Sequence, residues 1–126
     1  MMRIAKSNNP KVEMAQAISC AKESDYCWWG TAKNAVFAEE ILIFQVGNSS
    51  CAYGVLHAVE IKDGNQISDS EFTAHRPPSW GKERIYGRYY KITGGFLKTI
   101  SREAILRENG LPLRATDLRT NVKVTL

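Results

Sequence analysis

The strongest structural signal in this 126-residue chain is a pair of apolar segments separated by a short polar turn. Residues 40–46 and 52–61 are rich in Ile, Leu, Val, Phe and Tyr, and Gly47-Asn48-Ser49-Ser50 lies between them. β-Branched and aromatic runs that flank a turn of this composition are typical of a β-hairpin. The sequence therefore predicts a sheet built around residues 40–61.

Local patterns predict the elements around this hairpin. A helix is expected over residues 10–21, because Pro10 suits the first helical turn and apolar residues then recur at three- and four-residue spacing. The other expected elements, in chain order, are a short strand over 2–6, an extended segment over 27–31, a short helix over 32–40, a long loop that follows residues 62–65 and runs to 79, strands over 89–92 and 96–100 with a turn at 93–95, and a helical turn over 101–107. Together they predict a mixed α/β (α+β) domain with a curved sheet and two or three flanking helices.

Length and composition set the class of protein. One domain covering residues 1–126 is expected, since this length suits a single core, and 44% hydrophobic with 24% charged residues is ordinary for a folded protein. No apolar run approaches the roughly 20 residues of a membrane helix, and the first ten residues have no apolar region typical of a secretory signal. We therefore expect a cytoplasmic protein without a membrane partner.

The net charge of +4 indicates a mild preference for anionic partners such as nucleic acid. Residues 82–98 contain five basic side chains and a single acid, Glu83, so this segment predicts either a phosphate-facing surface or a solvated face. Cys20, Cys27 and Cys51 include no Cys-x-x-Cys pair and do not stand at metal-ligand spacing from a histidine. A disulfide framework, a zinc site and a bound cofactor are therefore not expected.

Enzyme motifs are missing from the sequence. There is no Gly-x-Ser-x-Gly, no His-Glu-x-x-His and no Gly-x-x-x-x-Gly-Lys. His57 lies within the predicted hairpin, where a structural role is the simpler interpretation, and His75 lies in the expected long loop. A non-enzymatic protein is favoured, and an enzyme that uses His75 or a cysteine as its reactive group is the alternative.

Three tryptophans are the most informative side chains. Trp28 and Trp29 are adjacent on an extended segment, so their side chains should face opposite ways, one into the core and the other outward or into a pocket. Trp80 follows Pro77-Pro78-Ser79 in the loop. They fit either two core tryptophans with a loop anchor, or an aromatic pocket that stacks a flat or methylated ligand such as an unpaired base.

The order of several motifs resembles the YTH domain. These motifs are Lys6-Ser7-Asn8-Asn9 before a helix, Trp28-Trp29-Gly30-Thr31, the Ile41-Leu42-Ile43-Phe44-Gln45-Val46 strand, Gly54 and the loop residue Trp80. The resemblance covers nearly the whole chain. It implies a YTH-like, PUA-like fold, an open curved β-barrel of about six strands flanked by two to four helices, and a reader of N6-methyladenosine.

The resemblance also implies roles for individual residues. Trp29, Trp80 and Ile85 would form the cage around the methyl group, while Trp28 would pack inward. The residues implied at the edge of the base are Asn8 through its backbone N–H and Gly30 through its carbonyl. Where the family commonly has Asn or Asp, this chain offers Lys11 or Val12, and we expect Lys11 to donate to the ring N1. Those implied at the phosphate backbone are Lys6, Ser7, Arg88, Arg114 and Arg119. The late Arg-Asp pair of the family is reversed here, as Asp117 precedes Arg119.

The leading hypothesis is a reader of N6-methyladenine in single-stranded RNA or DNA, or of a flipped-out base, through an aromatic cage. Burial of one methyl group contributes only about 0.8 kcal/mol, so selectivity requires a dry cage in which an unmethylated amine leaves an N–H unpaired. A module that senses methylated DNA in a defence system would use the same cage. The alternatives are an enzyme or enzyme-associated PUA-like domain acting on modified nucleotides, and a protein-interaction domain whose tryptophans are core.

Overall fold

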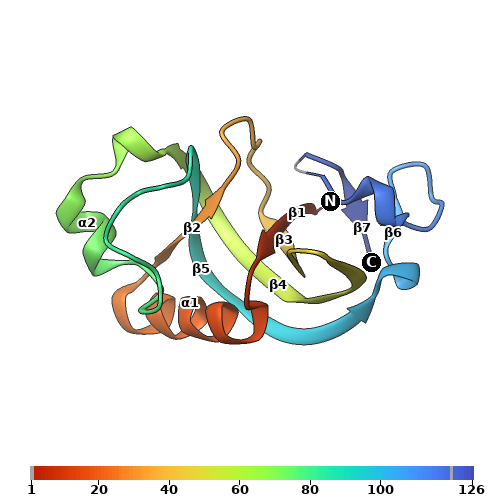
Figure 1. Cartoon of the computed structure of the whole chain (residues 1–126), viewed down its shortest axis with the longest axis horizontal. Coiled ribbons are helices and arrows are strands. Elements are labelled where there is room, and N and C mark those ends of the chain that lie inside the picture. Colours follow the sequence, from red (N-terminus) through yellow and green to blue (C-terminus); the bar gives the residue numbers. More distant parts are fainter. Residues whose placement is uncertain (1, 120) are drawn as a thin grey trace.

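A computed structural model of the protein describes residues 2–119 and 121–126 (Figure 1). The two α-helices are α1 (Pro10–Ser24) and α2 (Asp69–Ala74). The strands are β1 (Arg3–Ser7), β2 (Cys27–Thr31), β3 (Glu40–Gln45), β4 (Asn48–Asp63), β5 (Arg88–Ser101), β6 (Leu106–Arg107) and β7 (Val124–Thr125). Short 3-10 turns occupy Gly64–Gln66, Arg102–Ala104 and Ala115–Asp117. In the described part of the chain, no helix has the length and apolarity needed to cross a membrane.

Five strands form the main sheet in the order β1-β3-β4-β5-β2. β1 pairs with β3 in parallel, and the other neighbours are antiparallel. The predicted hairpin is confirmed as β3 and β4, which carry four consecutive buried residues at 41–44. The sheet is open, with β1 and β2 as its two edges, and β6 and β7 form a separate two-stranded sheet. The expected mixed α+β architecture is therefore present, built on five main strands.

The long strands β4 and β5 bend together at two glycines. Gly54 and Gly95 both have φ of +154°, a backbone conformation that residues with a side chain rarely adopt. A Cβ on either glycine would collide with a backbone carbonyl of the opposite strand, that of Phe96 or that of Val55. The prediction of two strands separated by a turn at 93–95 is therefore wrong, because Gly95 bends one continuous strand, Arg88–Ser101, instead of ending it.

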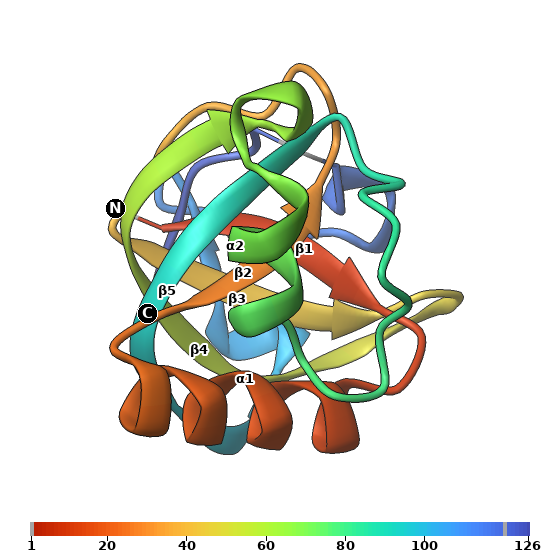
Figure 2. The same cartoon turned by 90° about the vertical axis from the view of Figure 1, so that its left-hand side faces the viewer.

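The core is divided between the two faces of the sheet. On one face, α1 places Met14, Ala17 and Ala21 against a cluster that includes Trp29 and Tyr90. On the other face, Phe72 of α2 packs with a cluster that contains Trp28. Figure 2 shows α1 running below the sheet and α2 standing in front of it. Neighbouring residues of β2 thus anchor two different helices.

Two further predicted elements differ from the structure. Residues 32–39 form a loop with a turn at 33–34 instead of a helix, and the Arg88 guanidinium and the Tyr90 hydroxyl bind the carbonyls of Ala35 (2.7 Å) and Val36 (2.8 Å) and tie this loop to β5. The loop predicted between residues 65 and 79 contains α2, whose first turn is capped by Ser68 accepting a hydrogen bond from the Glu71 N–H. The helix predicted over 10–21 is confirmed and continues to Ser24.

Candidate functional site

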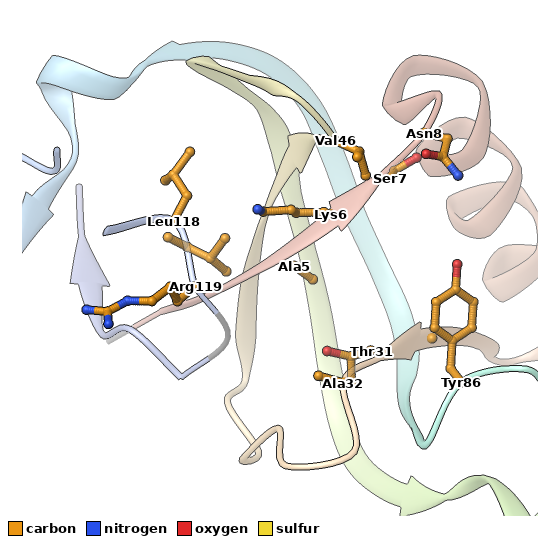
Figure 3. Close-up of a pocket in the computed structure, with 12 residues that line it drawn as sticks. Ala5, Lys6, Ser7, Asn8, Thr31, Ala32, Val46, Tyr86, Leu118 and Arg119 are labelled. Atoms are coloured by element: carbon orange, nitrogen blue, oxygen red, sulfur yellow. The ribbon is translucent and has the colours of Figure 1, made fainter. Parts of the chain in front are cut away.

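A cavity lined by several of the predicted site residues lies between the two edges of the open sheet. This edge cavity has a volume of about 510 Å³. It is lined by residues 4–8 on the β1 side, residues 30–32 on the β2 side, and Val46, Tyr86, Leu118 and Arg119 (Figure 3). Five residues predicted to touch base or backbone, Lys6, Ser7, Asn8, Gly30 and Arg119, therefore line one cavity. They come from three separate parts of the chain.

An aromatic cluster borders this cavity and has Trp80 at its centre. The Trp80 ring centroid lies 5.4 Å from that of Trp29 and 5.5 Å from that of Tyr86, with interplanar angles of 49° and 37°. Tyr89 meets Tyr86 edge-on at 5.9 Å. Spacings of this size are typical of attractive aromatic pairs. The rings of Trp29, Trp80 and Tyr86, called the aromatic cluster below, form a continuous set.

Ile85, the residue implied as the third side of the cage, lies at the surface next to the aromatic cluster. Its side chain is 76% exposed. It lines a smaller cavity of about 140 Å³ together with Glu13, Trp80 and Tyr86. The neighbouring residue Tyr86 makes the ring contact with Trp80. Sequence reasoning missed Tyr86, although an aromatic residue six positions after Trp80 in a polar loop is a signal that could have indicated it.

Both adjacent tryptophans are completely buried. The expectation that one of them would face outward or line a pocket is therefore wrong, although they do occupy opposite faces of the sheet. The indole N–H groups of Trp28 and Trp29 have no hydrogen-bond partner among the described residues. Trp29 reaches the aromatic cluster through its contact with Trp80, whose side chain is partly exposed.

Glu13 joins three parts of the site and was not predicted from the sequence. Its carboxylate accepts hydrogen bonds from the Ser7 hydroxyl (2.5 Å), the Asn9 backbone N–H (3.2 Å) and the Trp80 indole N–H. An acidic side chain in the first turn of α1 is also favoured by the helix dipole. Glu13 therefore ties the end of β1 and the start of α1 to the loop that carries Trp80.

Charge around the edge cavity comes mainly from two of the predicted cations. Lys6 and Arg119 are exposed and take part in no ion pair of the described structure. Arg88 instead binds Asp63 at 2.8 Å as well as the Ala35 carbonyl. Lys11 is exposed on α1 and does not line the edge cavity. Lys6 and Arg119 are thus the cations best placed to meet a phosphate.

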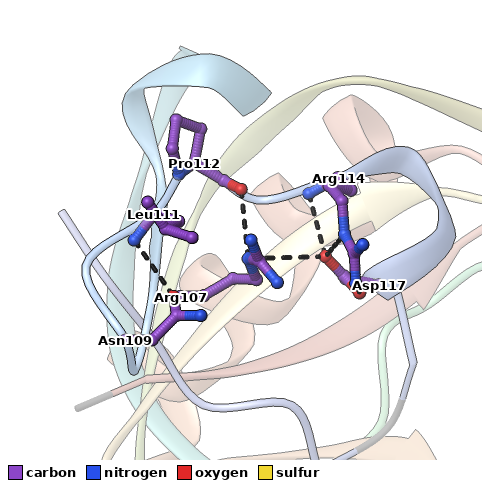
Figure 4. A network of polar contacts seen from close by, with 6 residues as sticks. All are labelled: Arg107, Asn109, Leu111, Pro112, Arg114 and Asp117. Carbon is purple, nitrogen blue, oxygen red and sulfur yellow. Dashed lines mark hydrogen bonds and ion pairs between the residues drawn. The ribbon is translucent and has the colours of Figure 1, made fainter.

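Arg114 belongs to a separate polar network next to the site (Figure 4). Its guanidinium donates to both carboxylate oxygens of Asp117, at 3.0 and 3.1 Å, and Arg107 lies 3.7 Å from the same carboxylate. The hydrogen bond from Arg114 lowers the pKa of Asp117 to about 2. The backbone of Asp117 accepts from the Arg119 N–H at 2.8 Å. This network holds the segment that brings Arg119 to the cavity.

The groups considered for catalysis do not form a hydrogen-bonded pair. His75 Nδ1 lies 3.1 Å from the carbonyl oxygen of Tyr26, and its ring stacks on the Tyr26 ring at 3.8 Å. The Cys20 thiol contacts the same carbonyl oxygen at 3.8 Å. No hydrogen bond joins Cys20 to His75 in the described structure, and His57 is placed beside Phe96. A hydrogen bond between thiol and base is one way to activate a nucleophile, and these side chains do not form such a pair in the described structure.

Comparison with known proteins adds no assignment to this geometry. No protein-family model matches the chain, and no curated protein is significantly similar to it. The site must therefore be interpreted from its own chemistry. It combines a partly exposed indole at the centre of an aromatic cluster with a neighbouring cavity that offers backbone polar groups and two cations. This arrangement is suited to a flat ring attached to an anionic chain.

Proposed function

We propose that this protein is a non-enzymatic reader of N6-methyladenine in single-stranded RNA or DNA, or of a base flipped out of a duplex. The observation that carries the proposal is the position of the aromatic cluster beside a cavity lined by Lys6, Asn8, Gly30 and Arg119. The open sheet with helices on both faces is consistent with a YTH-like, PUA-like fold, which we propose for the chain together with this function.

The chemistry of the cluster suits a methylated base better than a plain one. Aromatic faces stack on any base and contribute about 1–3 kcal/mol per base. The methyl group adds only about 0.8 kcal/mol by burial, whereas an amine hydrogen left without a partner in the same place costs about 1–3 kcal/mol. Together these effects favour the methylated base by roughly 2–4 kcal/mol, which corresponds to about 30- to 1000-fold in affinity.

The polymer attached to the base would lie along the edge cavity. Lys6 on β1 and Arg119 near the end of the chain lie on its lining, and the backbone amide of Asn8 and carbonyl of Gly30 are the groups proposed for the base edge. Arg88 and Arg114 already bind carboxylates, so we propose only a secondary role for them at the phosphates. Localisation in the cytoplasm and the absence of a cofactor belong to the same proposal.

Calorimetric titration with four matched oligonucleotides tests the function. The set contains RNA and single-stranded DNA, each with and without one N6-methyladenine, and the variants are Trp80→Ala and Phe96→Ala. Phe96 is the control, since it is an exposed aromatic residue on β5 that does not line the edge cavity. We expect the methylated strands to bind tightly, Trp80→Ala to abolish this binding and Phe96→Ala to retain it. Equal affinity for methylated and plain strands would refute the proposal.

A methylated ammonium group is a second candidate ligand, on one specific observation. Glu13 and Glu83 both line the smaller cavity beside Trp80. Carboxylates next to aromatic faces favour cations. Both carboxylate oxygens of Glu13 already accept hydrogen bonds, however, which makes its charge less available. A trimethyl-lysine peptide added to the same titration separates the two: we expect no binding, and binding of the peptide in preference to the oligonucleotides would reverse the order of the candidates.

A further inference from the structure

We propose that Tyr86 is an internal competitor of the ligand: its ring occupies the position of the base in the ligand-free protein and must rotate away before a base can bind. This inference rests on the proposed function, because it names the step that controls access to the same site. It is carried by the contact between Tyr86 and Gly30, the cavities that Tyr86 borders, and the way its backbone is held.

The first observation is that the Tyr86 ring lies directly on Gly30 of β2, a position called the seat of the ring below. A Cβ added to Gly30 would overlap three ring atoms of Tyr86, Cγ, Cδ2 and Cε2. The ring therefore rests directly on the backbone of a residue proposed to contact the base edge. Gly30 is the residue of β2 whose lack of a side chain leaves room for a flat group, and Tyr86 supplies that group.

The second observation is that Tyr86 borders three separate cavities. It lines the edge cavity of about 510 Å³, the smaller cavity of about 140 Å³ beside Trp80, and a third of about 500 Å³ lined also by Lys33, Arg84 and Arg88. Because one side chain stands at all three borders, its rotation would join the space beside Trp80 to the cavity that contains Lys6 and Asn8. A ligand that places its base next to Trp80 and its sugar-phosphate backbone in the edge cavity requires these two spaces to be joined.

The third observation is that hydrogen bonds hold the backbone next to Tyr86 but not its side chain. The Tyr86 N–H donates to the Tyr89 hydroxyl at 3.1 Å, and the next carbonyl, that of Gly87, accepts from the Gly64 N–H at 2.9 Å. The Tyr86 hydroxyl forms no hydrogen bond with any described residue, and the side chain is 39% exposed. In Figure 3 the ring points from the loop towards the N-terminus of α1, where Asn8 lies. Rotation of the ring away from Gly30 would therefore break ring contacts but no hydrogen bond of the side chain.

A ring in the seat makes binding depend on a minor open state. When the competent state is populated at 10% or less, the apparent affinity falls by the same factor, at least about tenfold. Binding then shows a rate that levels off with ligand concentration, since opening becomes limiting. A residue that only forms one side of a preformed cage would instead leave association unchanged and speed dissociation when truncated.

A double-mutant cycle in urea denaturation tests whether the Tyr86 ring lies on Gly30 in the protein without ligand. Gly30→Ala should lower the midpoint clearly in the wild-type and Tyr86→Phe backgrounds, because the ring must leave its seat, and only slightly in the Tyr86→Ala background. Gly81→Ala in the same loop is the control, since a Cβ there meets open space. Equal effects of Gly30→Ala in all backgrounds would overturn the proposal whatever the ligand is.

The gating step is tested by stopped-flow tryptophan fluorescence with the methylated RNA oligonucleotide. We expect the observed rate to level off for the wild type and Tyr86→Phe, and to rise linearly for Tyr86→Ala with association at least about tenfold faster. Equal association rates for Tyr86→Ala and wild type would overturn the gate. If the cycle shows coupling but none of the variants binds any methylated strand, the proposed function fails and the gate for that ligand fails with it, while the Tyr86–Gly30 contact stands.

Discussion

Removal of the Glu13 carboxylate should both destabilise the protein and release Trp80. The carboxylate accepts from three donors, the Ser7 hydroxyl, the Asn9 N–H and the Trp80 indole N–H. Hydrogen bonds to a charged group contribute about 1.5–3 kcal/mol each, but Glu13 is half-buried and water replaces part of this in the variant. We therefore expect Glu13→Ala to lower the free energy of unfolding by about 2–4 kcal/mol.

Urea denaturation and the emission spectrum provide two separate readouts of this change. Trp28 and Trp29 are fully buried, so a shift of the native emission to longer wavelength reports Trp80. Glu23→Ala is the matched control on the same helix, since the one side-chain hydrogen bond of Glu23 to a described residue is an exposed 3.5 Å bond from Ser19. It should change stability by less than about 0.5 kcal/mol. An equal cost for both variants, or destabilisation without an emission shift, would show that Glu13 does not hold Trp80.

Three further predictions concern stability at acid pH, the bend of β4 at Gly54, and the phosphate contacts of the ligand. Arg114 lowers the pKa of Asp117 to about 2 from an ordinary value of 3.8, so this pair stabilises the fold above pH 4 and loses its effect as the pH falls towards 2. Asp117→Asn should therefore reduce the dependence of the free energy of unfolding on pH between 4 and 2. Gly54→Ala should destabilise by roughly 1–3 kcal/mol in thermal or urea unfolding, as φ is +154° there. Lys6→Ala should weaken oligonucleotide binding and reduce the slope of log Kd against log salt by about 0.7, whereas Lys98→Ala on β5 should leave it unchanged.

Local chemistry was sufficient to predict most regular elements. The start of α1 at Pro10, the extended segment Cys27–Thr31 and the hairpin of β3 and β4 all follow from short-range patterns. The segment 32–40 could not be predicted in this way. Its conformation is fixed by Arg88 and Tyr90, side chains from about fifty residues further along the chain.

The candidate site shows the same division between local and distant effects. The resemblance indicated Lys6, Ser7, Asn8, Gly30 and Arg119, which the structure brings to one cavity. The bond between Glu13 and Trp80 joins residues 67 positions apart, so no sequence pattern predicts it. Tyr86 was missed because its role depends on the loop folding back onto Gly30.

The backbone hydrogen bonds of β5 and those of the segment 76–87 predict very different rates of amide hydrogen exchange, although both contribute to one site. β5, which pairs along its length with β4 and also with β2, should exchange only on global unfolding, and it holds Tyr89 and Tyr90 in place. The segment 76–87 pairs with no strand and is held instead by side-chain and loop contacts, among them the Trp80 indole N–H to Glu13 and the Tyr86 N–H to Tyr89. Its amides should therefore exchange by local opening that breaks no strand pair. Substitutions in this segment can change what the protein selects without breaking a strand pair.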